Sequence, residues 1–138
     1  MASTNKKKNR LAAVIIGSIL CTGALAEPGI TPAEIILGQA AGFTGSVAGT
    51  VKELTAGAKA YFDRVNATGG VHGRKIVLES LDDGFDPKRT PDVVRQLIDE
   101  KQVFALFLSR GTPTNEAAYP VLEAAKVPAG PINDLAEV

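Results

Sequence analysis

The chain has 138 residues, the length of one ordinary domain, and its 45% hydrophobic and 22% charged residues exclude a disordered chain. Its formal net charge is zero, but residues 1–26 contain four basic residues and no acidic one. The rest of the chain therefore has 11 basic and 15 acidic residues, and an acidic body without a basic stripe removes nucleic-acid binding from consideration.

The first segment, residues 1–26, has the three-part pattern of a secretory signal peptide. Basic residues gather between Lys6 and Arg10, an apolar core runs over residues 11–20, and a small-x-small cleavage site occupies residues 24–26. The apolar core is too short for an ordinary membrane span. We therefore expect cleavage after Ala26 and export to the periplasm.

The single cysteine of the chain, Cys21, lies inside this segment. A lipoprotein signal requires a small residue directly before its cysteine, whereas Leu20 occupies that position here, so we do not expect a lipid anchor. After cleavage the chain has no cysteine, which removes both disulfide bonds and thiol catalysis.

The first half of the exported chain predicts two strands with a helix between them. An apolar run over residues 34–41 predicts a buried strand, and a glycine-rich loop follows at residues 42–46. Between residues 47 and 66, apolar residues at helical spacing predict one buried face, made of Val51, Leu54, Ala58, Phe62 and Val65. A glycine pair ends this helix, and residues 75–81 predict a second strand before a turn at residues 82–84.

The second half predicts two more helices and two more strands. Thr90 followed by a proline predicts a helix with Thr90 as its N-cap. A continuous apolar run predicts a strand over residues 103–108. Thr112 repeats the cap-then-proline pattern for a helix that continues to Lys126. Residues 127–132 predict a fourth strand, which their two prolines restrict to a sheet edge or a short segment.

The predicted order β-α-β-α-β-α-β indicates an α/β fold, a parallel-sheet, Rossmann-like lobe with right-handed helical crossovers. No internal repeat and no linker divides residues 27–138. A sheet of this kind is covered on both faces, and the chain stops just after the fourth strand. We therefore interpret the lobe as incomplete.

Seven short stretches stand in a consistent order and spacing along residues 28–133: Gly38–Ala41, Thr44–Gly45, Ala60–Asn66, Gly69–Ile76, Asp82–Pro87, Val103–Phe107 and Gly111–Thr114. In this order they resemble the branched-chain amino-acid-type periplasmic binding proteins, the type I solute receptors of ABC transporters. No single stretch is decisive, and their common register carries the resemblance.

Proteins of this family have two α/β lobes joined by a hinge, which close on a ligand between them. The resemblance implies that residues 27–138 form part of the N-terminal ligand-binding lobe, with the second lobe absent. It further implies the substrate-binding component of an ABC uptake transporter, which captures an amino acid or a related small carboxylate or amide in the periplasm and delivers it to a permease. It implies no enzymatic activity, no cofactor and no metal. The alternative is the ligand-sensing domain of a receptor or regulator with the same lobe fold.

The stretch from Gly111 to Thr114 is the first candidate ligand site. A helix N-terminus presents backbone N–H groups and carries partial positive charge, which suits a carboxylate. Gly111 permits close approach to the backbone, Pro113 opens the helix, and Thr112 and Thr114 add hydroxyl groups. The resemblance implies that this loop holds the ligand's carboxylate, and the alternative is that Thr112 only caps the helix.

Two further segments lie where a ligand is expected. Ile132 and Asn133 lie at the end of the predicted fourth strand, where open α/β sheets bind ligands, and the alternative is an ordinary strand-to-helix loop. Phe43 and Thr44 follow the first strand at the same edge. Many relatives carry an aromatic residue slightly further along, against the ligand's side chain. Here that stretch reads Ala48-Gly49-Thr50, which argues against a leucine-like ligand.

The remaining polar residues do not assemble a catalytic or metal site. Asp82 and Asp83 are neighbours at a strand end and point to opposite faces, so we expect them to shape the turn at Gly84. His72 is the only histidine and has no cysteine or second histidine with which to bind a metal. A secreted α/β enzyme, the other alternative, would need a nucleophile with its base or a metal cluster.

Overall fold

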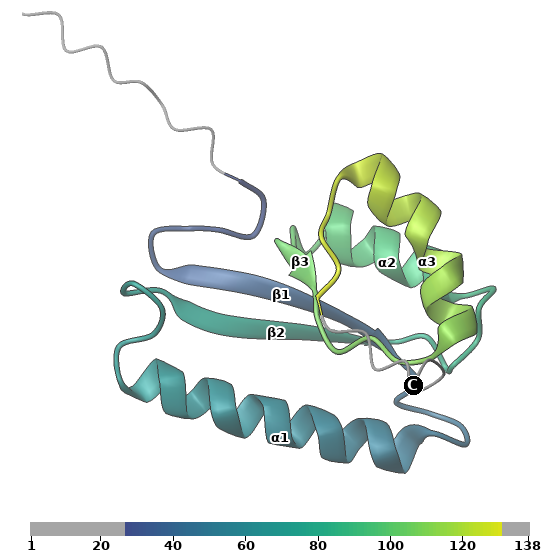
Figure 1. Ribbon diagram of the computed structural model, residues 1–138, viewed down its shortest axis with the longest axis horizontal. Coiled ribbons are helices and arrows are strands. Elements are labelled where there is room, and N and C mark those ends of the chain that lie inside the picture. The colour runs from purple at the N-terminus through teal and green to yellow at the C-terminus, as the bar shows by residue number, and fades with distance from the viewer. Residues whose placement is uncertain (1–26, 131–138) are drawn as a thin grey trace, which may run out of the picture.

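The computed structural model describes residues 27–130, in which three strands and three helices alternate along the chain (Figure 1). In chain order they are β1 (Glu34–Ala41), α1 (Ala48–Ala67), β2 (Lys75–Asp82), α2 (Thr90–Asp99), β3 (Ala105–Leu106) and α3 (Thr112–Ala125). The predicted signal peptide lies outside the described residues, as do Ile132 and Asn133. No helix within residues 27–130 is long and apolar enough to cross a membrane.

The sheet is parallel, with β1 as its middle strand and the order β2-β1-β3. β1 pairs over its whole length with β2, and with β3 at Leu37 and Gly38. Figure 1 shows α1 on one face of the sheet and α2 with α3 on the other. The predicted α/β arrangement is therefore confirmed, because parallel neighbours need crossover helices and these cover the sheet faces.

The main hydrophobic core lies between the sheet and the helices α2 and α3. Its buried members come from all of these elements: Ala40, Val94, Leu97, Val103, Leu106, Ala118 and Leu122. Gly38 lets β3 close on β1, because a Cβ at this position would lie only 2.9 Å from the Leu106 side chain. Each large aliphatic side chain buried here contributes about 1.5–3 kcal/mol, which holds α2 and α3 against the sheet.

The helix α1 covers the opposite face through three buried residues, Val51, Thr55 and Phe62. The predicted apolar stripe of this helix is correct at Val51 and Phe62 but wrong at Leu54, which is 37% exposed. Thr55 lies inside in its place because its hydroxyl hydrogen-bonds to the side chain of Gln39 in β1. A specific polar contact has therefore overridden the simple apolar periodicity.

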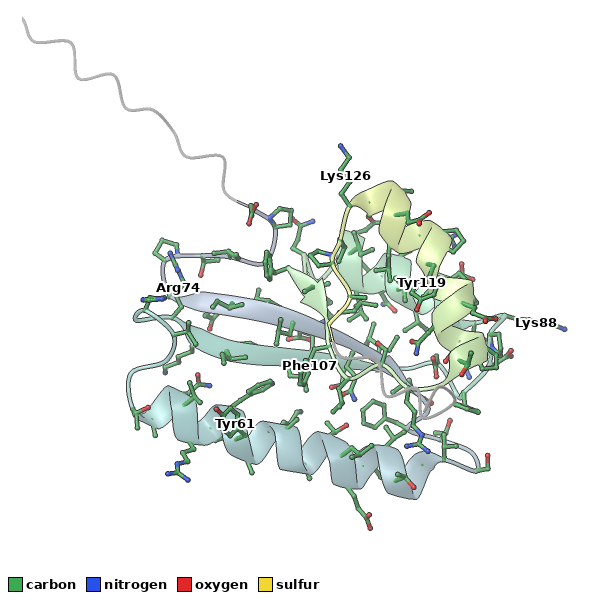
Figure 2. All side chains as sticks on the ribbon, in the orientation of Figure 1. Tyr61, Arg74, Lys88, Phe107, Tyr119 and Lys126 are labelled. Atoms are coloured by element: carbon green, nitrogen blue, oxygen red, sulfur yellow. The ribbon has the colours of Figure 1, made fainter. Side chains whose placement is uncertain are left out.

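The third strand is much shorter than the predicted segment of residues 103–108. Its two residues are followed by Phe107, labelled in Figure 2, whose ring centroid lies 5.5 Å from that of Phe62 in α1. Beyond Phe107 the strand cannot extend, because Leu108 has a left-handed φ of 59° that does not fit a strand.

Both predicted N-caps are wrong by one residue. Thr90 and Thr112 are the first residues of α2 and α3, and Arg89 and Gly111 occupy the N-cap positions. At α2 the reason is that a helical hydrogen bond already joins the Thr90 N–H to the Asp86 carbonyl at 3.1 Å. Thr90 therefore already belongs to the helix, which begins one residue earlier than the cap-then-proline pattern indicates.

Residues 127–130 contain only the beginning of the predicted fourth strand. Ala129 forms a parallel bridge with Leu106, and the Gly130 N–H donates to the Leu106 carbonyl at 2.7 Å. This bridge lies on the side of β3 away from β1 and has the predicted parallel direction. The rest of the predicted strand falls outside the described residues.

Candidate functional site

Three connecting segments meet at the carboxyl ends of the strands, on the right of the sheet in Figure 1. They are the loop after β1 (residues 42–47), the turn after β2 (residues 83–89) and the segment that leads from β3 into α3 (residues 107–111). This is the edge at which open α/β sheets bind their ligands. It is also where the predicted site residues Phe43, Thr44 and those from Gly111 to Thr114 are found.

The carboxylate of Asp82, the last residue of β2, holds the loop after β1. Its Oδ1 accepts hydrogen bonds from the backbone N–H groups of Phe43 at 2.8 Å, Thr44 at 3.1 Å and Gly84 at 2.9 Å. Its Oδ2 accepts one from the Thr44 hydroxyl at 2.7 Å. Desolvation would raise the pKa of Asp82, but the hydrogen bonds from Thr44, Gly84 and Phe43 outweigh it and leave the pKa below its ordinary value of 3.8.

The neighbouring Asp83 is fully buried and supports the turn from inside. Its Oδ1 accepts the N–H of Phe85 at 2.8 Å, and its Oδ2 lies 3.0 Å from the Thr90 hydroxyl. Burial raises the pKa of Asp83 in spite of the hydrogen bonds from Phe85 and Thr90. The two aspartates therefore serve different partners, and the prediction that they shape this turn is confirmed.

At the start of α3, the predicted site residues differ in their exposure. Pro113 is exposed and Thr112 is partly exposed, whereas Thr114 is buried. The Thr114 hydroxyl turns back to the helix, 2.7 Å from the Arg110 carbonyl and 2.8 Å from the Gly111 carbonyl. Thr114 thus supports the first turn of the helix, and Thr112 is the more exposed of the two threonines.

The ring of Phe85 packs against the N-cap of α3. A Cβ on Gly111 would lie 2.5 Å from Phe85 Cε2, and one on Gly42 would lie 2.9 Å from Phe85 Cβ. Phe85 itself has a φ of 58°, a left-handed conformation that a non-glycine residue rarely adopts. The turn after β2 therefore contacts both of the other segments. Phe85 was not among the residues predicted from the sequence, although an aromatic residue in an otherwise polar turn was the available signal.

Gln39 in β1 is a second residue that was not predicted from the sequence. It is only 1% exposed, and its Nε2 donates to the Thr55 hydroxyl at 3.0 Å and to the Leu108 carbonyl at 3.1 Å. Its Oε1 accepts a hydrogen bond from the Ser80 hydroxyl at 2.9 Å. Gln39 thus ties the left-handed turn at Leu108, which leads into α3, to the middle of the sheet. The signal was a polar residue in an apolar strand.

A small pocket lies behind the start of α3. It is lined by residues of β3, α3 and the chain that follows: Leu106, Ser109, Asn115, Ala118, Tyr119, Leu122, Ala129 and Gly130. Ser109 Oγ and Asn115 Nδ2 are buried there and find no hydrogen-bond partner within residues 27–130. The pocket is therefore an apolar space with two polar atoms.

Comparison with known proteins gives a consistent result. The sequence matches the periplasmic binding protein family over residues 34–135. It is 32% identical over 97 residues to the Leu/Ile/Val-binding protein BraC3 of Rhizobium johnstonii, an alignment that covers 70% of this chain and 25% of that protein. The chain thus spans about a quarter of the length of this curated relative.

Solved structures agree with this match. A fatty acid ABC transporter substrate-binding protein from Thermomonospora curvata has a TM-score of 0.67 and 33% identity, covering 73% of this chain and 26% of that one. An ABC transporter solute-binding protein from Rhodopseudomonas palustris, in complex with 3,4-dihydroxybenzoic acid, has a TM-score of 0.61 and 28% identity, covering 72% and 26%. The fold of the described residues is therefore that of a lobe of such proteins.

Proposed function

This chain belongs to the periplasmic binding protein family, and we propose that it is part of the solute-binding component of an ABC uptake transporter. It acts by binding a small molecule and not by catalysis. The observation that carries the proposal is the meeting of two segments at the carboxyl edge of the sheet. The α3 N-terminus, with Gly111, Thr112 and Pro113, lies there together with the loop of Phe43 and Thr44.

We propose a carboxylate as the common part of the ligand. Leu, Ile and Val, fatty acids and 3,4-dihydroxybenzoic acid, which appear in the names of the relatives, differ in their apolar parts but share a carboxylate. A helix N-terminus attracts this group through its partial positive charge and its N–H donors. In this proposal Thr112 offers its hydroxyl to the ligand, while buried Thr114 keeps the first turn of α3 in shape.

The apolar part of the ligand then decides which solute is taken up. An amino acid or a related small carboxylate satisfies the proposed site. Because residues 48–50 contain no aromatic side chain, the loop after β1 does not present a ring to the ligand in that stretch, and leucine itself is not favoured. Ile132 and Asn133 complete the proposed set of contacts from the segment after Ala129.

The described residues supply one side of a binding cleft. We propose that residues 27–138 belong to an N-terminal lobe and that a second lobe closes over the ligand about a hinge. Closure changes the surface that the permease of the transporter meets. The family acts outside the cytoplasm. We further propose that residues 1–26 are a cleaved signal peptide and that the site of action is the periplasm.

The proposal is tested by thermal unfolding of the protein as its host exports it. The ligands are L-isoleucine, palmitate and 3,4-dihydroxybenzoate, each beside its uncharged methyl ester. We expect at least one acid to raise the melting temperature in a concentration-dependent way, and its ester to bind about tenfold more weakly or worse, because the charge-assisted hydrogen bonds are lost. Equal binding of acid and ester would contradict the proposed carboxylate site. Failure of all three acids to bind would contradict the carboxylate-uptake proposal.

A further inference from the structure

We propose that Asp82 and Phe85 are positioning residues, which hold two segments in a fixed relation to each other. These segments are the proposed ligand-binding loop after β1 (residues 42–47) and the start of α3 at Gly111. Neither residue is among the predicted ligand contacts. The positioning role rests on the proposed function, whereas the contacts that connect the two segments do not depend on it.

The first half of the connection runs through one carboxylate. Asp82 Oδ1 accepts N–H groups from Phe43 and Thr44 on the ligand-binding loop and from Gly84 on its own turn. The loop and the turn therefore share an acceptor atom, and a shift of one pulls on the hydrogen bonds of the other. Thr44 is exposed, so Asp82 is its principal anchor within the described residues.

The second half of the connection runs through an aromatic ring. Phe85 follows Gly84 directly, and its backbone N–H donates to Asp83 Oδ1 at 2.8 Å. Its ring lies so close to Gly111 that a side chain at the N-cap of α3 would overlap with it unless the ring shifted. Its Cβ is similarly close to Gly42, at the start of the ligand-binding loop. Contacts thus lead from Thr44 through Asp82, Gly84 and Phe85 to Gly111.

The start of α3 has a further support, which sets the size of the expected effect. Gln39 holds the Leu108 carbonyl from the middle of the sheet. Loss of Phe85 therefore loosens the N-cap without detaching the helix. A role limited to stability predicts that Asp82→Ala disturbs only the loop of residues 42–47. It also predicts that Phe85→Ala, which keeps the Cβ next to Gly42 and loses the ring next to Gly111, disturbs only the start of α3. A positioning role predicts that both segments respond to each variant.

Hydrogen exchange followed by mass spectrometry separates these two roles without any ligand. The natural protein is compared with Asp82→Ala and Phe85→Ala, and the peptides of interest contain residues 42–47 and 109–115. We expect both variants to speed exchange in both peptides by about tenfold, because the loss of the hydrogen bonds to the Asp82 carboxylate, or of the packing of the Phe85 ring, makes local opening easier. Faster exchange confined to residues 42–47 in Asp82→Ala, or confined to residues 109–115 in Phe85→Ala, would overturn the proposal.

Three further variants guard against a general loss of folding. Asp82→Asn keeps Oδ1 as an acceptor and Phe85→Leu keeps an apolar group, so both should recover most of the protection. Val103→Ala removes buried volume at the amino end of β3, away from the ligand edge. It should lower the melting temperature without selective exchange in the two peptides. If Val103→Ala reproduces the pattern of Asp82→Ala, the effect is not positional and the proposal fails.

Binding provides the functional readout, with L-isoleucine, palmitate and 3,4-dihydroxybenzoate as ligands. For any of these that the natural protein binds, Asp82→Ala and Phe85→Ala should weaken the affinity by about tenfold, while Val103→Ala leaves the affinity of the folded fraction unchanged. If the natural protein binds none of them, the proposed function fails. The exchange result still decides whether the two residues couple the segments.

Discussion

The ring of Phe85 fills the space that a side chain on Gly111 would occupy, since a Cβ built there would lie 2.5 Å from Cε2 of the ring. The two residues come from different crossover segments, and their contact joins the turn after β2 to the first turn of α3. Gly111 also has a φ of 106°, so both its backbone and its surroundings require glycine.

Gly111→Ala should lower the free energy of unfolding by about 2–4 kcal/mol, because backbone strain and steric overlap add. Urea denaturation measures this loss. Gly57→Ala in α1, where no atom lies within 4 Å of the added Cβ, is the matched control and should stabilise the protein by about 0.5–1 kcal/mol. The double variant Gly111→Ala with Phe85→Ala should recover part of the loss. No recovery would show that Phe85 is not the obstacle.

Gln39→Leu should lower the free energy of unfolding by about 2–4 kcal/mol. The change leaves the Leu108 carbonyl and the hydroxyls of Ser80 and Thr55 without their partner in a buried region. The exposed Gln96 carries the same side chain on α2, and Gln96→Leu should change stability by less than about 0.5 kcal/mol. Equal effects at the two positions in chemical denaturation would mean that the Gln39 network contributes nothing specific.

The stability contributed by Asp82 should depend on pH in a defined direction. Its pKa in the folded chain is below the ordinary value of 3.8, so its contribution is complete above that value and is lost as the pH falls through the lowered pKa. Asp82→Asn should therefore be less stable than the natural protein at pH 7, and the difference should shrink in acid. Unfolding curves between pH 7 and pH 2 measure the difference in stability, and a difference that stays constant over this range would contradict the assignment.

Asp83 should show the opposite dependence. Its pKa is raised above 3.8 by burial, so the charged form destabilises the folded state, and this cost appears as the pH rises from 3.8 through the raised pKa. Asp83→Asn removes the charge and still offers an oxygen to the Phe85 N–H. The variant should therefore be closest in stability to the natural protein at pH 7, and its relative stability should fall in acid. A variant whose stability relative to the natural protein is highest in acid would contradict this sign.

Thr112→Val should weaken the binding of a carboxylate ligand by about tenfold or more, because it removes the hydroxyl while nearly keeping the shape of the side chain. Titration calorimetry with the acid that binds in the thermal screen measures the affinity. Thr68→Val, in an exposed threonine at the end of α1, is the control and should bind normally. Normal binding by Thr112→Val would mean that Thr112 serves the helix and not the ligand.

The exported protein should begin at Glu27. Intact mass and N-terminal sequencing of the protein from the host periplasm test this expectation, which rests on the charge, apolar core and small residues of residues 1–26. A lipid mass attached to Cys21, or a chain that keeps Met1, would contradict it.

The elements could be predicted from the sequence to within a few residues where local signals were strong. β1 and α1 follow from apolar periodicity, and the glycine pair after α1 marks its end. Errors arose where a contact distant in the chain outweighed the local pattern. Thr55 is buried in place of Leu54 because Gln39 binds it, and β3 stops at Leu106 because the backbone turns at Leu108.

By itself the sequence determined the alternation of strands and helices, the parallel direction of the sheet and the family, because these depend on periodicity, turn residues and motif order along the chain. Only the tertiary structure decided that Asp82 holds Thr44, that Phe85 covers Gly111 and that Gln39 reaches Leu108. These contacts join residues far apart in the chain, and the packing of helices on the sheet brings them together. Local preference does not encode such distances, because a side chain's partner depends on where every intervening element has packed.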